Sequence, residues 1–96
     1  MVGICLIEMY LADSNSLKDK RRIVKSLKQR IRQRFNVSVH ESHYQDNRQK
    51  AEFEIAVSAG DKTGAEKVLQ EVLKFAEIDG RTEIVNSHFD YYYIDF

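Results

Sequence analysis

The chain has 96 residues, of which 43% are hydrophobic and 31% are charged, and its formal net charge is zero. This length fits a single domain spanning residues 1–96, and the composition argues against wholesale disorder. The single cysteine, the lack of an apolar run near the ~20 residues of a membrane span and the lack of a secretory signal pattern predict a cytoplasmic protein without membrane contact.

The first part of the chain has the pattern of a strand followed by a helix. Residues 2–11 are apolar on both alternations apart from Glu8, which predicts a central strand that is largely covered on both sides. Ser16 is a suitable N-cap for the helix that follows, and Asp19 stands at the capping-box position. From Leu17 to Phe35 the apolar residues recur with the period of a helix.

Two strands are predicted in the middle of the chain. Residues 37–44 alternate like a strand, residues 45–48 are polar and typical of a turn, and residues 50–59 alternate again. In the second of these strands Glu52 and Glu54 point away from the apolar side. Acids on that face would repel phosphate, so the open sheet is a poor candidate for RNA binding.

The last part of the chain predicts a second helix and a final strand. Asp61 and Thr63 are both suitable caps for the helix, and Gly80 is a natural stop after it. Residues 82–95 are rich in tyrosine and have the pattern of a strand. The order is therefore βαββαβ. Right-handed crossovers place both helices on one face of a four-stranded antiparallel sheet and leave the other face without a helix.

The zero net charge conceals a strongly basic first helix. Residues 17–34 hold nine Lys and Arg and one acid, Asp19, so this segment carries +8 and the rest of the chain −8. Lys20 and Arg34 point into the apolar arc of the helical wheel, and Arg30 lies on the opposite flank. The other six bases share an arc of about 120°: Lys18, Arg21, Arg22, Lys25, Lys28 and Arg32.

These six bases predict a surface that follows the phosphate backbone of a nucleic acid. Such a surface gains affinity from counterion release and reads little sequence. We therefore expect a non-enzymatic RNA- or ribosome-associated domain. Two alternatives remain open at this point: the partner is an acidic protein surface, or the basic face is solvated and partly neutralised by acids of the second helix, which are Glu66, Glu71 and Glu77.

Two further groups of residues invite a metal or catalytic interpretation. His40, Glu41 and His43 resemble a metal cluster, but strand alternation would point the two histidines in opposite directions. Gly60 and Gly64 lack the rest of a phosphate-loop pattern, and nothing places Ser, His and Asp together as a triad. We therefore expect no metal, no cofactor, no small-molecule substrate and no enzymatic activity.

The aromatic end of the chain suggests a second kind of function. The run of aromatic residues places some rings on the helix side and some on the open face, where exposed Tyr and Phe favour interfaces. The alternative function is thus a homodimeric protein-interaction or regulatory module that uses the open sheet face. The candidate interface residues are Tyr91, Tyr92 and Tyr93.

Several short segments resemble the bacterial YlxP-like family. They are Ser-Leu-Lys-Asp-Lys-Arg-Arg at 16–22, Arg-Phe-Asn-Val-Ser-Val at 34–39, Glu41, Gln-Asp at 45–46 and Gln-Lys-Ala at 49–51. The resemblance covers nearly the whole chain and implies a ferredoxin-like fold. It also implies a ribosomal or RNA role, by association of family members with translation-initiation and ribosome-maturation factors, and it supplies no catalytic residue. The sequence departs from the family at Arg48, where many members carry tryptophan, and in its tyrosine-rich end.

Overall fold

The computed structural model describes residues 1–95, so Phe96, at the end of the aromatic run, lies outside the described part. Its elements are β1 (Val2–Tyr10), α1 (Leu17–Arg34), β2 (Ser38–His43), β3 (Lys50–Ser58), α2 (Lys62–Ile78) and β4 (Glu83–Tyr92). The predicted order βαββαβ is confirmed. The final strand is shorter than predicted, because β4 ends at Tyr92 rather than at residue 95.

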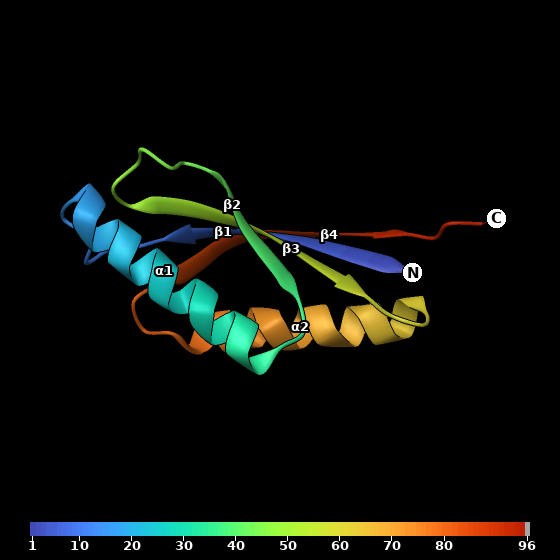
Figure 1. Ribbon diagram of the computed structural model, residues 1–96. Coiled ribbons are helices and arrows are strands. Elements are labelled where there is room, and N and C mark those ends of the chain that lie inside the picture. The colour runs from blue at the N-terminus through green and yellow to red at the C-terminus, as the bar shows by residue number, and fades with distance from the viewer. Residues whose placement is uncertain (96) are drawn as a thin grey trace.

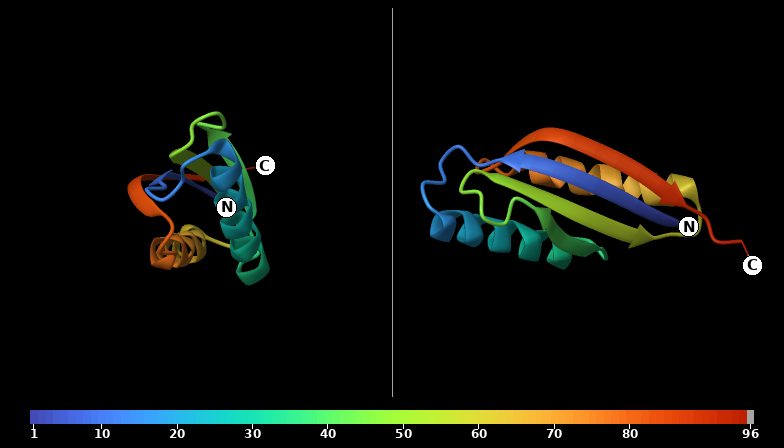
Figure 2. Two further views of the ribbon diagram at one scale, coloured as in Figure 1. Left: turned by 90° about the vertical axis from the view of Figure 1, so that its left-hand side faces the viewer. Right: turned by 90° about the horizontal axis from the view of Figure 1, so that it is seen from above.

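The four strands form one antiparallel sheet in the order β2-β3-β1-β4, with both helices on the same face (Figure 1). Seen from above, α1 lies on the side of β2 and β3, and α2 runs behind β1 and β4 (Figure 2). The prediction that residues 2–11 are covered on both sides is wrong. β1 is central, but the residues on its outer side, such as Ile4 and Leu6, are only half-buried because no described helix covers that face.

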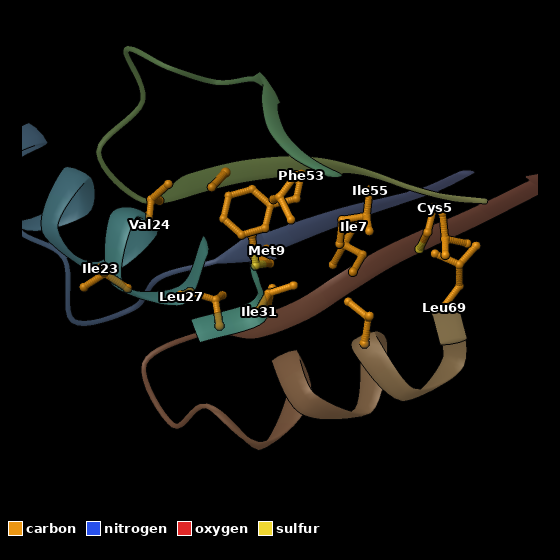
Figure 3. Close-up of a cluster of buried hydrophobic side chains, with 14 of the residues drawn as sticks. Cys5, Ile7, Met9, Ile23, Val24, Leu27, Ile31, Phe53, Ile55 and Leu69 are labelled. Carbon is orange, nitrogen blue, oxygen red and sulfur yellow. The ribbon is translucent and has the colours of Figure 1, made fainter. Parts of the chain in front are cut away.

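The core fills the space between the sheet and the two helices (Figure 3). The largest of its fully buried apolar side chains are Ile7, Met9, Leu11, Leu27, Ile31, Phe53, Ile55, Leu69 and Val72. Burial of each such side chain contributes about 1.5–3 kcal/mol before conformational entropy is subtracted. Gly3 lets α2 approach β1 closely, since a Cβ there would lie 3.0 Å from the Leu69 side chain.

Both helices begin at polar caps. The Ser16 hydroxyl accepts a hydrogen bond from the Asp19 N–H at 3.0 Å, which confirms the predicted cap of α1. Asp61 rather than Thr63 caps α2, because its carboxylate accepts from the Gly64 N–H at 2.8 Å. α1 ends at Arg34, since Phe35 adopts an extended backbone.

Candidate nucleic-acid interface on α1

α1 carries the nine basic residues that the sequence singles out, and the fold divides them into two groups. Four of them are engaged by other parts of the chain: Lys20, Arg30, Arg32 and Arg34. The remaining five lie on the outer surface of the helix. None of the described helices is long and apolar enough to cross a membrane.

Lys20 is the most deeply buried base of α1, with 1% of its side chain exposed. Its ammonium donates to the Tyr44 carbonyl and lies 3.3 Å from Glu41 Oε2. That oxygen is itself buried and has no aligned hydrogen-bond donor, so the contact is an ion pair without hydrogen-bond geometry. Tyr44 has a positive φ of 67°, and this turn directs its carbonyl toward α1. Lys20 therefore joins α1 to the end of β2.

Arg30 belongs to a network around the buried Asp79, at the junction of α1, α2 and β4. The Asp79 carboxylate, 3% exposed, accepts from Arg30 at 3.1 Å and from Arg81 at 2.7 Å and 3.0 Å. Arg81 also donates to Ser26 on α1 at 3.2 Å. Hydrogen bonds from Arg81 hold the pKa of Asp79 below its usual 3.8, with a smaller contribution from the charge of Arg30. The network fixes the flank of α1 that faces α2.

Arg32 and Arg34 are also occupied, although both are exposed at the surface. Arg32 donates to the Val39 carbonyl of β2 at 2.9 Å. The guanidinium of Arg34 lies over the Phe35 and Phe75 rings at 5.9 and 5.6 Å, within the range of cation–π attraction. Of the six bases predicted to bind nucleic acid, Arg32 is therefore also part of the contact between α1 and the sheet edge.

Four bases of α1 make no ion pair, side-chain hydrogen bond or cation–π contact among residues 1–95, and we call them the basic stripe: Lys18, Arg21, Lys25 and Lys28. Lys28 is half-buried and the other three are exposed. They follow one another at spacings of three and four residues, so they form a continuous row about 15 Å long. Arg22 flanks the row. It is 77% exposed and lies 3.7 Å from Asp19, which makes its pairing weak.

The acids of α2 do not neutralise the basic stripe. The flank of α1 that faces α2 carries Ser26 and Arg30, and the stripe lies about 80–180° around the helix from them. Glu66, one of the α2 acids that could have neutralised the stripe, instead pairs with Lys62 of its own helix at 3.7 Å. The charges of the stripe thus face solvent on the side of α1 away from α2.

The open face of the sheet is acidic near the β2–β3 turn. Glu8 of β1 lies directly opposite Glu52 of β3, and Glu54 follows two residues later on the same face. The charge of Glu8 is the largest cause of the raised pKa of Tyr44, which lies near both acids. The hollow beside Glu8 and Glu52 holds about 70 Å³, the volume of a few water molecules. Lys50 lies on the same face, but Glu8, Glu52 and Glu54 outnumber it, so this face is less suited to phosphate than the outer side of α1.

The histidines of β2 are arranged differently from the prediction. A register shift between Glu41 and His43 inserts one extra residue, so His40 faces Glu54 and His43 faces Glu52 on the same open side of the sheet. The expectation that the two histidines point in opposite directions is therefore wrong. His43 Nδ1 lies 2.9 Å from Glu52 Oε1, which makes a two-residue contact. No group of three or more metal-binding side chains occurs in the described part of the chain.

The single cysteine is buried beneath the helices. Cys5 is 1% exposed, and burial raises its pKa to about 12. A thiol with such a pKa is almost entirely protonated at neutral pH, so Cys5 is a core residue rather than a nucleophile.

The three tyrosines of the predicted interface lie on different surfaces. Tyr91 is half-buried on the helix side, next to Gly3, with the Lys62 ammonium 5.3 Å from its ring. Tyr92 and Tyr93 are 51% and 71% exposed. Tyr91 thus completes the core of its own domain, and only the other two offer much free surface.

The order of elements, the antiparallel sheet and the placement of both helices define a ferredoxin-like α+β domain. Two designed proteins of known structure have the same fold. The de novo designed protein Foldit4 matches with a TM-score of 0.60 and 17% identity, covering 97% of this chain and 100% of that one. A de novo designed protein with ferredoxin fold, LFR1 1, matches with a TM-score of 0.57 and 12% identity, covering 96% of this chain and 87% of the other.

Sequence comparison identifies the family. The model of a protein family of unknown function, DUF503, matches residues 2–89, and the chain belongs to this family. An uncharacterized protein of Bacillus subtilis (strain 168), YlxP, is 40% identical over 84 residues, which is 88% of this chain and 89% of that protein. The resemblance expected from the short segments is confirmed. Residues 90–95, which include the exposed Tyr92 and Tyr93, lie beyond the match to the family model.

Proposed function

We propose that this protein binds structured RNA, such as that of ribosomal particles, through the phosphate backbone and without catalysing a reaction. The contact surface is the basic stripe of Lys18, Arg21, Lys25 and Lys28, flanked by Arg22 and Arg32. One observation carries the proposal. Four bases of α1 make contacts with other parts of the fold, whereas the four bases of the stripe have no acidic partner among residues 1–95.

The distribution of charge supports one mode of approach. The stripe lies on the outer surface of α1, and the opposite layer of the molecule carries Glu8, Glu52 and Glu54. A polyanion is thus attracted to α1 and repelled from the open sheet face. Because lysine and arginine side chains contact phosphate oxygens without reading bases, we expect affinity for folded RNA with little sequence preference.

A pair of matched double variants tests the proposal. Lys18→Glu with Lys25→Glu reverses two exposed lysines seven residues apart on α1. The control, Lys67→Glu with Lys74→Glu, makes the same charge change at the same spacing on exposed positions of α2. Binding is measured at low salt to a labelled fragment of ribosomal RNA that contains double-helical stems, and circular dichroism verifies the fold of each variant.

The α1 variant is expected to bind at least about tenfold more weakly than the wild type, because it loses two phosphate contacts and gains two repulsive charges. The α2 control is expected to stay within about threefold of the wild type, since it changes the net charge equally but leaves the stripe intact. Equal weakening by both variants, or no binding by the wild type at low salt, would contradict the proposal.

A further inference from the structure

The two edges of the sheet differ in how well they are protected from pairing with another strand. β2 is short, has a register shift between Glu41 and His43, and has its Val39 carbonyl occupied by Arg32. Short length, a bulge and a covering charge are the devices by which natural sheets block their edges. The β2 edge is therefore closed.

The β4 edge carries few of these devices. β4 is ten residues long, and its register shift lies near its start, so residues 86–92 pair regularly with β1. Between Val85 and Tyr93 there is one acid, Asp90, and neither lysine nor arginine. Seen from above, β4 forms the outer margin of the sheet (Figure 2). Four of the six exposed large apolar side chains of the described chain lie on β4 or directly after it: Val85, Tyr92, Tyr93 and Ile94.

We propose that β4 pairs antiparallel with β4 of a second copy of this chain, about a two-fold axis at Phe89, to give a continuous eight-stranded sheet. An exposed strand edge offers a row of unpaired backbone N–H and C=O groups, and a second copy supplies the matching row. This inference is independent of the proposed RNA binding.

The sequence of β4 is complementary to itself in this register. Pairing about Phe89 places His88 opposite Asp90 of the second copy, and by symmetry the same contact occurs twice. It also places Asn86 opposite the exposed Tyr92 of the second copy, and both residues lie in the stretch that pairs regularly with β1. Cross-strand pairs of opposite charge each contribute roughly 0.2–1 kcal/mol. Both side chains of the polar pair are exposed in the single chain. Asp90 accepts hydrogen bonds there from the Tyr91 N–H at 2.9 Å and from the Tyr92 hydroxyl at 2.8 Å, and the dimer exchanges these for the contact with His88 of the second copy.

Analytical ultracentrifugation over about 5–500 µM tests the dimer directly, and charge-reversed variants test its register. In His88→Asp, the new carboxylate would face Asp90 of the second copy, so two acids would oppose each other on each side of the axis. In Asp90→Lys, the new ammonium would face His88 of the second copy without an acid to pair with. Each variant is expected to raise the dimer dissociation constant roughly tenfold. Mixing the two variants is expected to restore association as a heterodimer. The aspartate introduced at position 88 of one chain then faces the lysine introduced at position 90 of the other, and the native His88 faces the native Asp90.

Ile78→Lys is the control, since it charges an 82% exposed apolar residue on α2, away from β4, and is expected to leave association unchanged. Restored association in the mixture supports the register, because a merely misfolded variant would not recover on mixing. A wild type that stays monomeric over the whole range would overturn the proposal. Dimers that resist both charge-reversed variants would also overturn it.

Discussion

Lys20 shows why the position of a base on the helical wheel does not determine its role. It falls within the apolar arc of α1, where its stem packs and its ammonium reaches the Tyr44 carbonyl and Glu41. The carbonyl has a second donor, the Asn47 N–H at 2.9 Å, whereas Glu41 Oε2 has only the lysine. The charge of Lys20 therefore matters mainly to Glu41.

Removing one member of this pair is expected to destabilise the fold more than removing both. Lys20→Met should lower the free energy of unfolding by about 3 kcal/mol, because it leaves the Glu41 carboxylate partly buried without a cation. The double variant Lys20→Met with Glu41→Leu should lie within about 1 kcal/mol of the wild type. Urea unfolding of the two variants measures the difference. A double variant as unstable as Lys20→Met would show that the ion pair is not the cause.

Asp79 is expected to make stability depend on pH. The pKa of Asp79 is below 3.8 in the folded protein. The contribution of its carboxylate to the free energy of unfolding is therefore complete above that pH, and it is lost as the pH falls through the lowered pKa. Asp79→Asn keeps the shape but removes the charge, and at pH 7 it should lower the free energy of unfolding by about 1.5–3 kcal/mol, the range for hydrogen bonds to a charged group. Urea unfolding measures the difference in free energy of unfolding between variant and wild type, and this difference should narrow as the pH falls below 3.8. A difference that stays constant with pH would show that the charge of Asp79 does not stabilise the fold.

At the residue scale, five of the six bases in the predicted arc are exposed and Lys28 is half-buried. Arg30 and Arg34, outside that arc, are exposed as well, and the sequence does not predict the partners of these bases. A helical wheel gives the angle of each side chain, and this angle separates Lys20 from the outer arc. The wheel cannot predict that Arg32 donates to the Val39 carbonyl, because that contact depends on where β2 crosses α1. The network of Asp79 and Arg81 is missed for the same reason, since its members are far apart in the sequence from Ser26 and Arg30.

At the scale of single elements, the ends of α1 follow from local sequence. The Ser16 side chain satisfies the Asp19 N–H, and the Asp19 carboxylate accepts from the Asn15 N–H at 3.3 Å. Both contacts lie within one turn, so the pattern predicts them without knowledge of the fold. The bulge in β2 could not be predicted in this way, because strict alternation fits residues 37–44 and only the pairing with β3 reveals the shift.

Ser16→Ala is expected to lower the free energy of unfolding by about 1 kcal/mol, because the Asp19 N–H loses its partner at the start of α1. Ser58→Ala, at an exposed position at the end of β3, is the matched control and should stay within about 0.5 kcal/mol of the wild type. Thermal or urea unfolding of the two variants measures both effects. A loss of equal size in both variants would assign the effect to serine removal in general rather than to the cap.

At the scale of the whole molecule, zero net charge arises from two separate surfaces. The free bases lie on the outer side of α1, and the acids Glu8, Glu52 and Glu54 lie on the open face of the sheet. The topology rules predict this separation, because both crossovers place the helices on one face. If two copies pair through β4, their α1 helices lie at opposite margins of the extended sheet, so a long RNA would meet two basic stripes and bind with greater avidity.

The salt dependence of RNA binding tests the central claim most directly. If the four bases of the stripe each neutralise one phosphate, the logarithm of the affinity should fall against the logarithm of the salt concentration with a slope of about −3.6. The variant Lys18→Glu with Lys25→Glu should show a slope of about −1.8, and the α2 control Lys67→Glu with Lys74→Glu should keep the wild-type slope. Binding that does not change with salt, or identical slopes for all three proteins, would contradict a phosphate-binding role for α1.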